Sequence, residues 1–249
     1  MRKTLFTLVL FSAMLTNPTW GQNVNEIIAA SKTALGGDAW DKINGLKYNA
    51  TVEQMGMSIP IEIAMMANGK MYVRAKFQGM EITQEAYDGE TKWSTNFMTQ
   101  KAEKADQEST ENTKRGCKDF PNGLFHYQDF GYTPTLEGEE MTEGAMCYKI
   151  KLEKKTQLSE GKEVPNIEYY YIDKDSKAIL MMETEMPSGA MKGQIAQMKY
   201  SDYQEVSGVY VAFSQTMGIK GGESQALSFS SVVANPNIAV EAFQFPGDK

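Results

Sequence analysis

Histidine and cysteine are scarce in this chain of 249 residues, which contains one His and two Cys. Zinc in proteins is usually held by four closely spaced Cys or His ligands, so we expect no metal site. The motifs G-x-S-x-G, G-x-G-x-x-G, H-E-x-x-H, C-x-x-C and the P-loop are missing as well. His126 stands alone, and we interpret it as a structural residue because the sequence places no nucleophile or orienting carboxylate beside it. We therefore expect neither an enzyme nor a cofactor.

Basic runs and long apolar runs are also missing from the body of the chain. Lys and Arg total 25 against 32 Asp and Glu, which gives a formal net charge of −7 and a pI near 5.0. An acidic chain without a basic patch argues against nucleic acid as a partner. After the first residues, no stretch approaches the roughly 18 apolar residues of a membrane helix. The composition is that of a globular protein, and the length fits one all-β domain.

The start of the chain has the pattern of a secretory signal peptide. Arg2 and Lys3 give it a positive charge, and residues 5–15 form an apolar run that is too short to span a bilayer. Gly21 supplies a small residue at a suitable cleavage point. We predict a signal peptide over residues 1–21.

The mature protein is then expected to begin at Gln22 and to comprise residues 22–249 as a single domain. No Cys lies near the predicted cleavage point, so we expect no lipid attachment there. We predict a water-soluble protein in the periplasm.

Two interpretations of the cysteines remain open. An oxidising compartment permits Cys117 and Cys147 to form a disulfide. Alternatively, Cys147 is a small buried hydrophobic residue, while the polar stretch around Cys117 is exposed.

A short helical segment opens the mature chain. Asn23 or Asn25 can cap it, and the pair Gly36-Gly37 can end it. A second short turn is expected over residues 39–43. The apolar residues that recur near helical spacing are Val24, Ile27, Ile28 and Leu35.

From residue 57 onward, apolar and polar residues alternate with a period of two, which indicates half-buried strands. Asn68-Gly69 and Asp88-Gly89 are strong hairpin signals. Residues 101–118 interrupt the strands as a helix or an exposed loop. We predict about ten antiparallel strands that curl into an incomplete barrel closed by helices. The predicted strands are 57–65, 71–77, 80–87, 93–97, 146–152, 167–171, 179–186, 194–203, 209–217 and 226–233.

Two acidic groups are interpreted as turns. Asp173 and Asp175 resemble the opening of a calcium loop, but the Gly and the Glu that complete such a loop are missing. The second group contains Glu137, Glu139, Glu140 and Glu143. For this group we favour a solvated turn over a metal site or a docking site for a cationic partner.

Methionine is frequent, with 17 residues in the chain, and many of them lie in the alternating strands. Their side chains are unbranched and flexible. One interpretation is an ordinary core that uses Met. The other is a deformable apolar cavity for a ligand without a fixed shape, such as an acyl chain.

Several segments, in this order and spacing, resemble one protein family. They are Ile27–Gly37, Tyr87–Trp93, Gly131-Tyr132 with Glu137-Gly138, Tyr171–Asp173 with Ile179-Leu180, Ser201–Tyr203 with Gly208-Val209, and Asn235-Pro236 with Phe243–Pro246. Over nearly the whole mature length, the chain resembles the LolA-like periplasmic lipoprotein carriers, or outer-membrane lipoprotein-sorting proteins. Because the matching motifs are structural turns, no binding residue of the family is carried over.

The resemblance implies a mainly β fold: a strongly curved antiparallel half-barrel of about 10–11 strands, with an N-terminal helix and a small helical lid over the concave face. It implies a carrier that binds acyl chains of lipids or lipoproteins for transfer toward the outer membrane, without covalent chemistry. Inner- and outer-membrane proteins are the expected partners, and we expect a monomer. The alternative is a lipid- or lipoprotein-sensing regulator on the same scaffold, and an enzyme or a purely structural protein is the third class.

The residues expected to line the cavity are chosen by strand alternation. They are Met57, Ile59, Ile61, Ile63, Met65, Met71, Val73, Phe77, Trp93, Phe97, Met182 and Met198.

Overall fold

The structure is a computed structural model that describes residues 23–54 and 57–248. The predicted signal peptide and the predicted N-terminus at Gln22 lie outside the described residues. No helix within the described ranges is long and apolar enough to cross a membrane.

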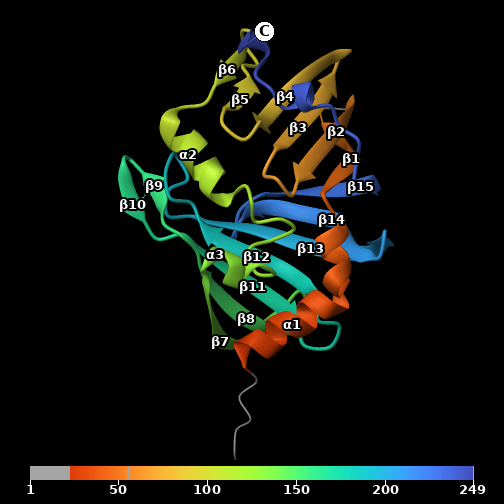
Figure 1. Cartoon of the computed structure of the whole chain (residues 1–249), viewed down its shortest axis with the longest axis vertical. Helices are drawn as coiled ribbons and strands as arrows, with labels where there is room; N and C mark the ends of the chain where they lie inside the picture. Colours follow the sequence, from red (N-terminus) through yellow and green to blue (C-terminus); the bar gives the residue numbers. More distant parts are fainter. Residues whose placement is uncertain (1–22, 55–56, 249) are drawn as a thin grey trace, which may run out of the picture.

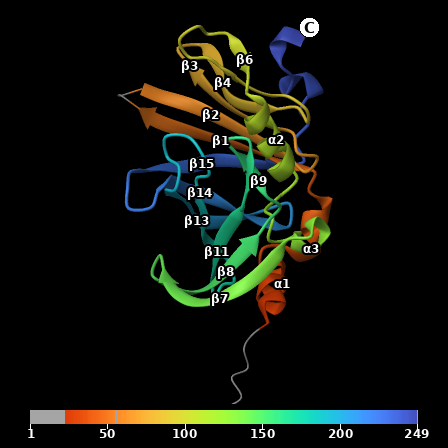
Figure 2. The same cartoon turned by 90° about the vertical axis from the view of Figure 1, so that its left-hand side faces the viewer.

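One open antiparallel sheet of 13 strands forms most of the molecule (Figures 1 and 2). The strand order is β6-β5-β4-β3-β2-β1-β15-β14-β13-β12-β11-β8-β7. The sheet curves strongly, so that it has a concave and a convex face (Figure 2). A separate hairpin pairs β9 with β10. The strands are β1 (Gly45–Gln54), β2 (Met57–Met66), β3 (Met71–Phe77), β4 (Met80–Tyr87), β5 (Lys92–Thr95), β6 (Ala102–Lys104), β7 (Thr133–Thr142), β8 (Ala145–Glu153), β9 (Gln157–Ser159), β10 (Lys162–Val164), β11 (Ile167–Asp173), β12 (Ile179–Glu185), β13 (Ile195–Val206), β14 (Val209–Ile219) and β15 (Ser224–Ala234).

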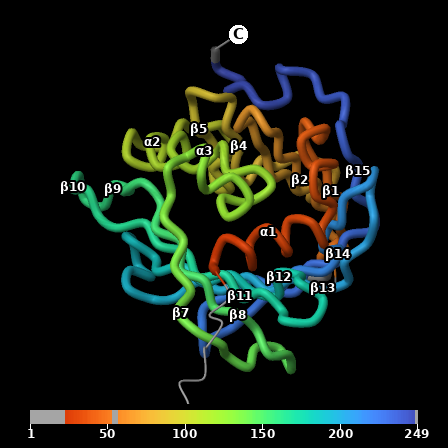
Figure 3. The backbone as a smooth tube through the Cα atoms, turned by 60° about the horizontal axis from the view of Figure 1, so that its bottom comes forward, coloured from red at the N-terminus to blue at the C-terminus, as the bar shows by residue number. Residues whose placement is uncertain are grey.

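The helices are few and short. Figure 3 shows α1 lying inside the curve of the sheet, on its concave side. The mainly β, strongly curved sheet with an N-terminal helix is therefore confirmed. The helical elements are α1 (Val24–Ala34), η1 (Gly37–Lys42), α2 (Gln107–Gly116), α3 (Tyr127–Phe130), η2 (Val240–Ala242) and η3 (Pro246–Asp248).

The ends of α1 follow from local chemistry. The side chain of Asn23 accepts a hydrogen bond from a backbone N–H of the first turn at 3.0 Å. Ile27 and Ile28 are buried against the concave core. Gly36 ends the helix with φ +124°, and a Cβ there would lie 2.8 Å from Cα of Val209. Only glycine satisfies both the backbone conformation and the close approach to β14, so the predicted stop is confirmed.

The sheet has more strands than expected, because some segments were not recognised as strands. β1 is the main omission, although Leu46, Tyr48 and Ala50 alternate with polar residues and are buried. β6 has three residues, too few to show a period in the sequence, and the residues of β7 were interpreted in part as a turn. β9 and β10, also of three residues each, form the separate hairpin.

The acidic cluster is solvent-exposed, as predicted, but only Glu143 lies in a turn, so the prediction of a turn is wrong for the other three residues. Glu137, Glu139 and Glu140 lie in β7, which is an edge strand of the sheet, and Glu143 follows in the β7–β8 turn. Three of these carboxylates, those of Glu139, Glu140 and Glu143, pair with lysines, as in the 3.2 Å ion pair between Glu140 and Lys149. Charged side chains along an edge strand hinder its pairing with another sheet.

The interpretation of Asp173 as a turn carboxylate is confirmed. It accepts hydrogen bonds from the backbone N–H groups of Asp175 (3.3 Å) and Ser176 (3.0 Å). Burial opposes its ionisation, but these bonds and that of the Ser176 hydroxyl hold the pKa of Asp173 below its usual value.

The two cysteines are free thiols and do not form the disulfide that was one of two interpretations. Cys117 follows α2, whereas Cys147 is fully buried in β8 beside Tyr171 and Met181 on the convex face. Burial, helped by nearby carboxylates, raises the pKa of Cys147 to about 11, so this thiol stays protonated at neutral pH. Cys147 is therefore the small buried hydrophobic residue of the alternative interpretation.

The C-terminal segment packs on the convex face of β2–β5. Its anchor is Phe243, which packs with Tyr72 at 5.4 Å between ring centroids. The backbone oxygen of Phe243 also accepts a 2.8 Å hydrogen bond from Nε1 of Trp93. Arg74 donates to the neighbouring carbonyl of Ala242. This face of the sheet is thus buried by the chain itself.

Candidate functional site

An apolar cavity of about 290 Å³ lies on the concave face of the sheet. Strands β1–β3 and β11–β15 form its wall, and none of its lining residues is charged. The sheet side chains that line it are Tyr48, Ile63, Met65, Met71, Val73, Tyr170, Ile179, Met198, Tyr200, Tyr203, Tyr210, Val211, Ala212, Gln215, Met217 and Phe229. A cleft of this kind suits an apolar ligand.

The other side of the cavity is closed by the N-terminal helical region and by the loop over residues 117–126. Leu35, which caps the C-terminal end of α1, and Trp40 of η1 contribute from this region, and Phe125 contributes from the loop. Nε1 of Trp40 donates a 2.8 Å hydrogen bond to the backbone oxygen of Leu35. The ring of Trp40 meets Phe120 of the loop edge-on, with centroids 6.2 Å apart. The two parts of this lid therefore pack on each other.

A buried ion network fastens the loop to the sheet. Asp119 lies 2.6 Å from Nζ of Lys154, which also lies 2.7 Å from Glu168 in β11. The hydroxyl of Tyr132 donates to Asp119 at 2.9 Å. Burial alone would lower the pKa of Lys154, but the two carboxylates outweigh it and raise the pKa above its usual value. Lys154 thus stays charged and holds the loop over the cavity.

A second cavity of about 260 Å³ adjoins the first, because Met65 and Met71 line both. It lies between the end of α2 and the β2–β3 turn, where Cys117 approaches Gly69. Gly69 has φ +90°, and a Cβ there would lie 2.6 Å from Sγ of Cys117. The close contact requires glycine and seats α2 on the β2–β3 turn.

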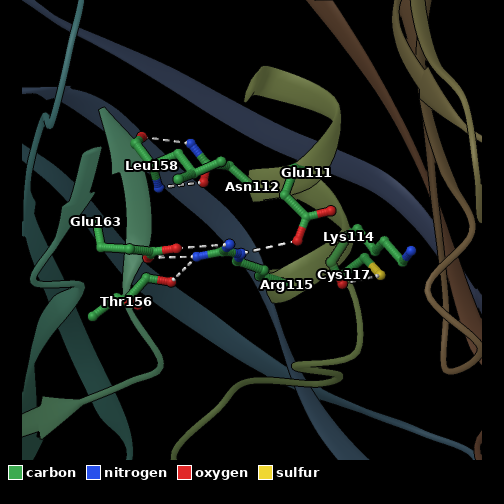
Figure 4. A network of polar contacts seen from close by, with 8 residues as sticks. All are labelled: Glu111, Asn112, Lys114, Arg115, Cys117, Thr156, Leu158 and Glu163. Carbon is green, nitrogen blue, oxygen red and sulfur yellow. Dashed lines mark hydrogen bonds and ion pairs between the residues drawn. The ribbon is translucent and has the colours of Figure 1, made fainter. Parts of the chain in front are cut away.

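Helix α2 is bound to the β9–β10 hairpin by polar contacts (Figure 4). Arg115 forms two hydrogen bonds to the carboxylate of Glu163, at 2.7 and 3.0 Å, and a third to the backbone oxygen of Thr156 at 2.9 Å. The side chain of Asn112 pairs with both backbone groups of Leu158, at 2.7 and 2.8 Å. No residue of α2 is fully buried, so these polar contacts, rather than an apolar face, position the helix.

A charged cavity of about 650 Å³ lies on the convex side, beside β9 and β10. Its wall includes Lys149, Glu160, Glu183 and Lys192. Lys192 and Glu160 already pair with each other at 2.8 Å. Because charged side chains of both signs line it, this cavity suits an acyl chain less well than the uncharged concave cavity does.

Five of the twelve residues predicted from alternation line the concave cavity: Ile63, Met65, Met71, Val73 and Met198. Ile61 and Met182 are partly buried and pack against the same core. Met57, Ile59 and Phe77 face the same side by strand register but lie beyond the cavity lining. The structure therefore brings most of the predicted set to one face.

Trp93 and Phe97 do not lie where the sequence placed them. Trp93 pairs with Ala86 across β4–β5 and belongs to the convex cluster under the C-terminal segment. Phe97 lies in the turn after β5, is 66% exposed, and meets the ring of Phe77 edge-on with centroids 6.4 Å apart. Neither residue lines the concave cavity.

Sequence reasoning missed the aromatic part of the wall. Tyr48, Tyr200, Tyr203 and Phe229 were not selected, although Tyr48 alternates with polar neighbours in β1. The loop residue Phe125 was missed too, although Leu124-Phe125 is an apolar pair in a polar stretch.

His126 takes a structural position. It precedes α3, and its Nδ1 lies 3.2 Å from Oδ2 of Asp129 one turn later. Its ring also meets Phe130 edge-on with centroids 6.3 Å apart. These contacts stabilise the end of the lid loop.

Solved structures of low sequence identity share this fold. A DUF1329 family protein from Desulfovibrio piger ATCC 29098 matches 91% of this chain and 99% of its own, at 12% identity and a TM-score of 0.55. A domain from Vibrio parahaemolyticus, proposed to be an outer membrane lipoprotein-sorting protein, matches 89% and 97%, at 13% identity and a TM-score of 0.52. A LolA superfamily protein from Nitrosomonas europaea matches 86% and 97%, at 13% identity and a TM-score of 0.51.

These likenesses define the class of the molecule as a lidded, open β half-barrel. More particularly, the chain has a LolA-like fold, which confirms at the level of fold the resemblance seen in the sequence. No protein-family model and no curated protein sequence matches the chain.

Proposed function

We propose that this protein binds an acyl chain of a lipid or lipoprotein in the concave cavity and carries it through the periplasm toward the outer membrane, without covalent chemistry. The observation that carries the proposal is an uncharged cavity closed by a lid on the concave face of a LolA-like fold. The fold of the Vibrio domain proposed to sort outer membrane lipoproteins supports it. The predicted signal peptide supports the compartment.

The cavity volumes are of the right size for such a ligand. Burial of a methylene group is worth about 0.8 kcal/mol, so about 12 kcal/mol opposes the passage of a ~16-carbon chain through water. We take one chain carbon to occupy about the volume of one water molecule, about 30 Å³. The 290 Å³ cavity then accommodates about ten chain carbons. The two adjoining cavities, with about 550 Å³ together, accommodate about 18 chain carbons. A long acyl chain thus needs more volume than the concave cavity has, and the adjoining cavity supplies it, although Lys70, Glu85 and Asp119 also lie in the wall of that second cavity.

The test is a transfer assay with fluorescent acyl lipid in donor vesicles and unlabelled acceptor vesicles. We expect the mature protein to extract the lipid and to deliver it to acceptors, and native mass spectrometry of periplasmic protein to find co-purified lipid. A sensor would instead keep the lipid and release a protein partner. Protein that never takes up the lipid would overturn the proposal.

A matched pair of variants locates the uptake. Met198→Glu places a carboxylate in the apolar cavity, and we expect it to weaken acyl-probe binding at least tenfold. Met191→Glu makes the same change at a residue that is 47% exposed in the β12–β13 connection, and we expect wild-type binding. Equal binding by both variants would place the ligand elsewhere.

A further inference from the structure

Two tyrosine hydroxyls on the cavity wall have no hydrogen-bond partner among the described residues. They belong to Tyr48 in β1, which is only 8% exposed, and to Tyr200 in β13. Two neighbouring tyrosines differ, since Tyr203 donates to the backbone oxygen of Ile179 at 2.7 Å and Tyr170 donates to Glu168 at 2.7 Å. Neither hydroxyl is among the side-chain atoms that the described part of the protein fully encloses without a partner, so both are accessible from the cavity and can donate to a group bound there.

The unpaired donors lie close together on the wall. Tyr200 pairs directly with Gln215 across β13–β14, so both side chains face the cavity. The amide of Gln215 likewise has no partner within the described part of the chain. The ring of Tyr48 stacks obliquely on Phe229 at 4.8 Å and approaches from the other side of β14 and β15. Tyr48 is close enough to Tyr200 for the charge of one phenolate to raise the pKa of the other.

The chemistry of the wall defines what these donors can bind. Burial raises the pKa of both Tyr48 and Tyr200 well above the usual value, so both remain protonated donors at physiological pH. The cavity offers donor groups but no cation, because none of its lining residues is charged. A carboxylate there would be a buried charge without a counter-ion, whereas a neutral carbonyl oxygen needs only donors.

We propose that Tyr48, Tyr200 and Gln215 form a polar station that binds the neutral carbonyl oxygen of an acyl ester or amide. The ligand is then an acylated molecule that enters the cavity as far as its ester or amide bond, rather than a bare hydrocarbon or a free fatty acid. This inference rests on the proposed function, since it names the chemical class of the ligand at the same site.

The test compares two neutral ligands that differ only in the carbonyl group, monodecanoylglycerol and 1-O-decylglycerol. Each displaces the fluorescent probe N-phenyl-1-naphthylamine from the mature protein. We expect the ester to bind at least tenfold more tightly than the ether, which corresponds to about 1.4 kcal/mol. Decanoate serves as a third ligand, and we expect it to bind more weakly than the ester at pH 7.

Tyr48→Phe and Tyr200→Phe remove only the hydroxyls. In each we expect the ester to lose about fivefold in affinity while the ether keeps its affinity and the melting temperature stays unchanged. Gln215→Leu is a third variant with the same expectation. The matched control is Tyr210→Phe, because Tyr210 lines the cavity but is 41% exposed, and we expect no change.

Three results would overturn the inference. Equal binding of ester and ether by the wild type would show that these three side chains do not bind a carbonyl oxygen, while the carrier proposal would still stand. Tighter binding of decanoate than of the ester would show that the site prefers a carboxylate to a neutral carbonyl group. If neither ligand displaces the probe from the wild-type protein, both the inference and the proposed function are wrong.

Discussion

Asp119 and Lys154 form an ion pair with an O–N distance of 2.6 Å, and their side chains are only 10% and 8% exposed. Lys154 keeps Glu168 as a counter-ion when Asp119 is removed, so the cost is that of a lost buried hydrogen bond to a charged group, about 1.5–3 kcal/mol. We therefore expect Asp119→Ala to lower the melting temperature by roughly 3–12 °C, measured by circular dichroism. Because Asp119 belongs to the lid loop, faster release of bound acyl probe should accompany the loss.

The matched control is the exposed ion pair between Lys192 and Glu160, whose side chains are 54% and 71% exposed. Exposed pairs contribute about 1 kcal/mol or less, so Lys192→Ala should shift the melting temperature by no more than about 4 °C. Equal shifts in the two variants would contradict the structural role of Asp119.

A second prediction concerns the attachment of α2 to the β9–β10 hairpin. Arg115→Ala removes its three hydrogen bonds to Glu163 and Thr156 at the partly exposed edge of the molecule. We expect this loss to weaken the attachment of α2 to the hairpin, and hence about fivefold faster release of an acyl probe in stopped-flow experiments. Lys114→Ala, on the same helix but exposed, is the control. Unchanged release in Arg115→Ala would mean that α2 does not limit exit.

Alternation was sufficient to place β2 and β3 correctly. Ile63 pairs with Val73, and both line the cavity, as the period of two predicts for adjacent antiparallel strands. The same rule could not assign a face to Trp93, because the side on which β5 presents it depends on its register with β4. The C-terminal segment that buries Trp93 is 150 residues away in the sequence, so no local pattern reveals it.

The lid and the polar part of the wall could not be predicted either. Asp119 and Lys154 are far apart in the sequence and meet only because the loop folds back on β8. Tyr48 and Tyr200 approach each other across two intervening strands, which requires both the strand order and the curvature of the sheet. Local periodicity specifies the faces of strands, whereas the site depends on how distant strands meet.

A third prediction uses the buried carboxylate of Glu183 on the convex face. Burial alone would raise its pKa, but hydrogen bonds from Gln197 (2.6 Å) and Tyr171 (2.9 Å) and the ammonium of Lys220 (2.9 Å) hold the pKa below the usual 4.5. A lowered pKa in the folded state stabilises the protein above the unfolded-state value and ceases to do so as the pH falls through the folded-state value.

We therefore expect Glu183→Gln to be less stable than wild type by about 1–3 kcal/mol at pH 7, and the difference to shrink as the pH falls below 4.5. Urea unfolding at a series of pH values measures it. Glu185→Gln, at an exposed position of the same strand, should leave the pH profile unchanged. A difference that grows toward acid pH would show that the sign assigned to Glu183 is wrong.

The last prediction concerns chain length and the boundary between the two cavities. Met65 and Met71 line both, and an unbranched thioether has three rotatable bonds with which to open a passage. Ile is branched at Cβ and stiff at χ1, so Met65→Ile and Met71→Ile should hold the passage closed. An 8-carbon chain fits the 290 Å³ cavity alone, whereas a 16-carbon chain needs the volume of both cavities.

We expect the Met65→Ile and Met71→Ile variants to bind octanoyl glycerol like the wild type but to lose about tenfold or more in affinity for palmitoyl glycerol. Met57→Ile, on the same face of β2 but outside both cavities, should bind both ligands normally. If Met65→Ile and Met71→Ile retain the wild-type affinity for the long chain, the chain does not pass between these two side chains, and its distal end must lie along the open strands beyond the cavity.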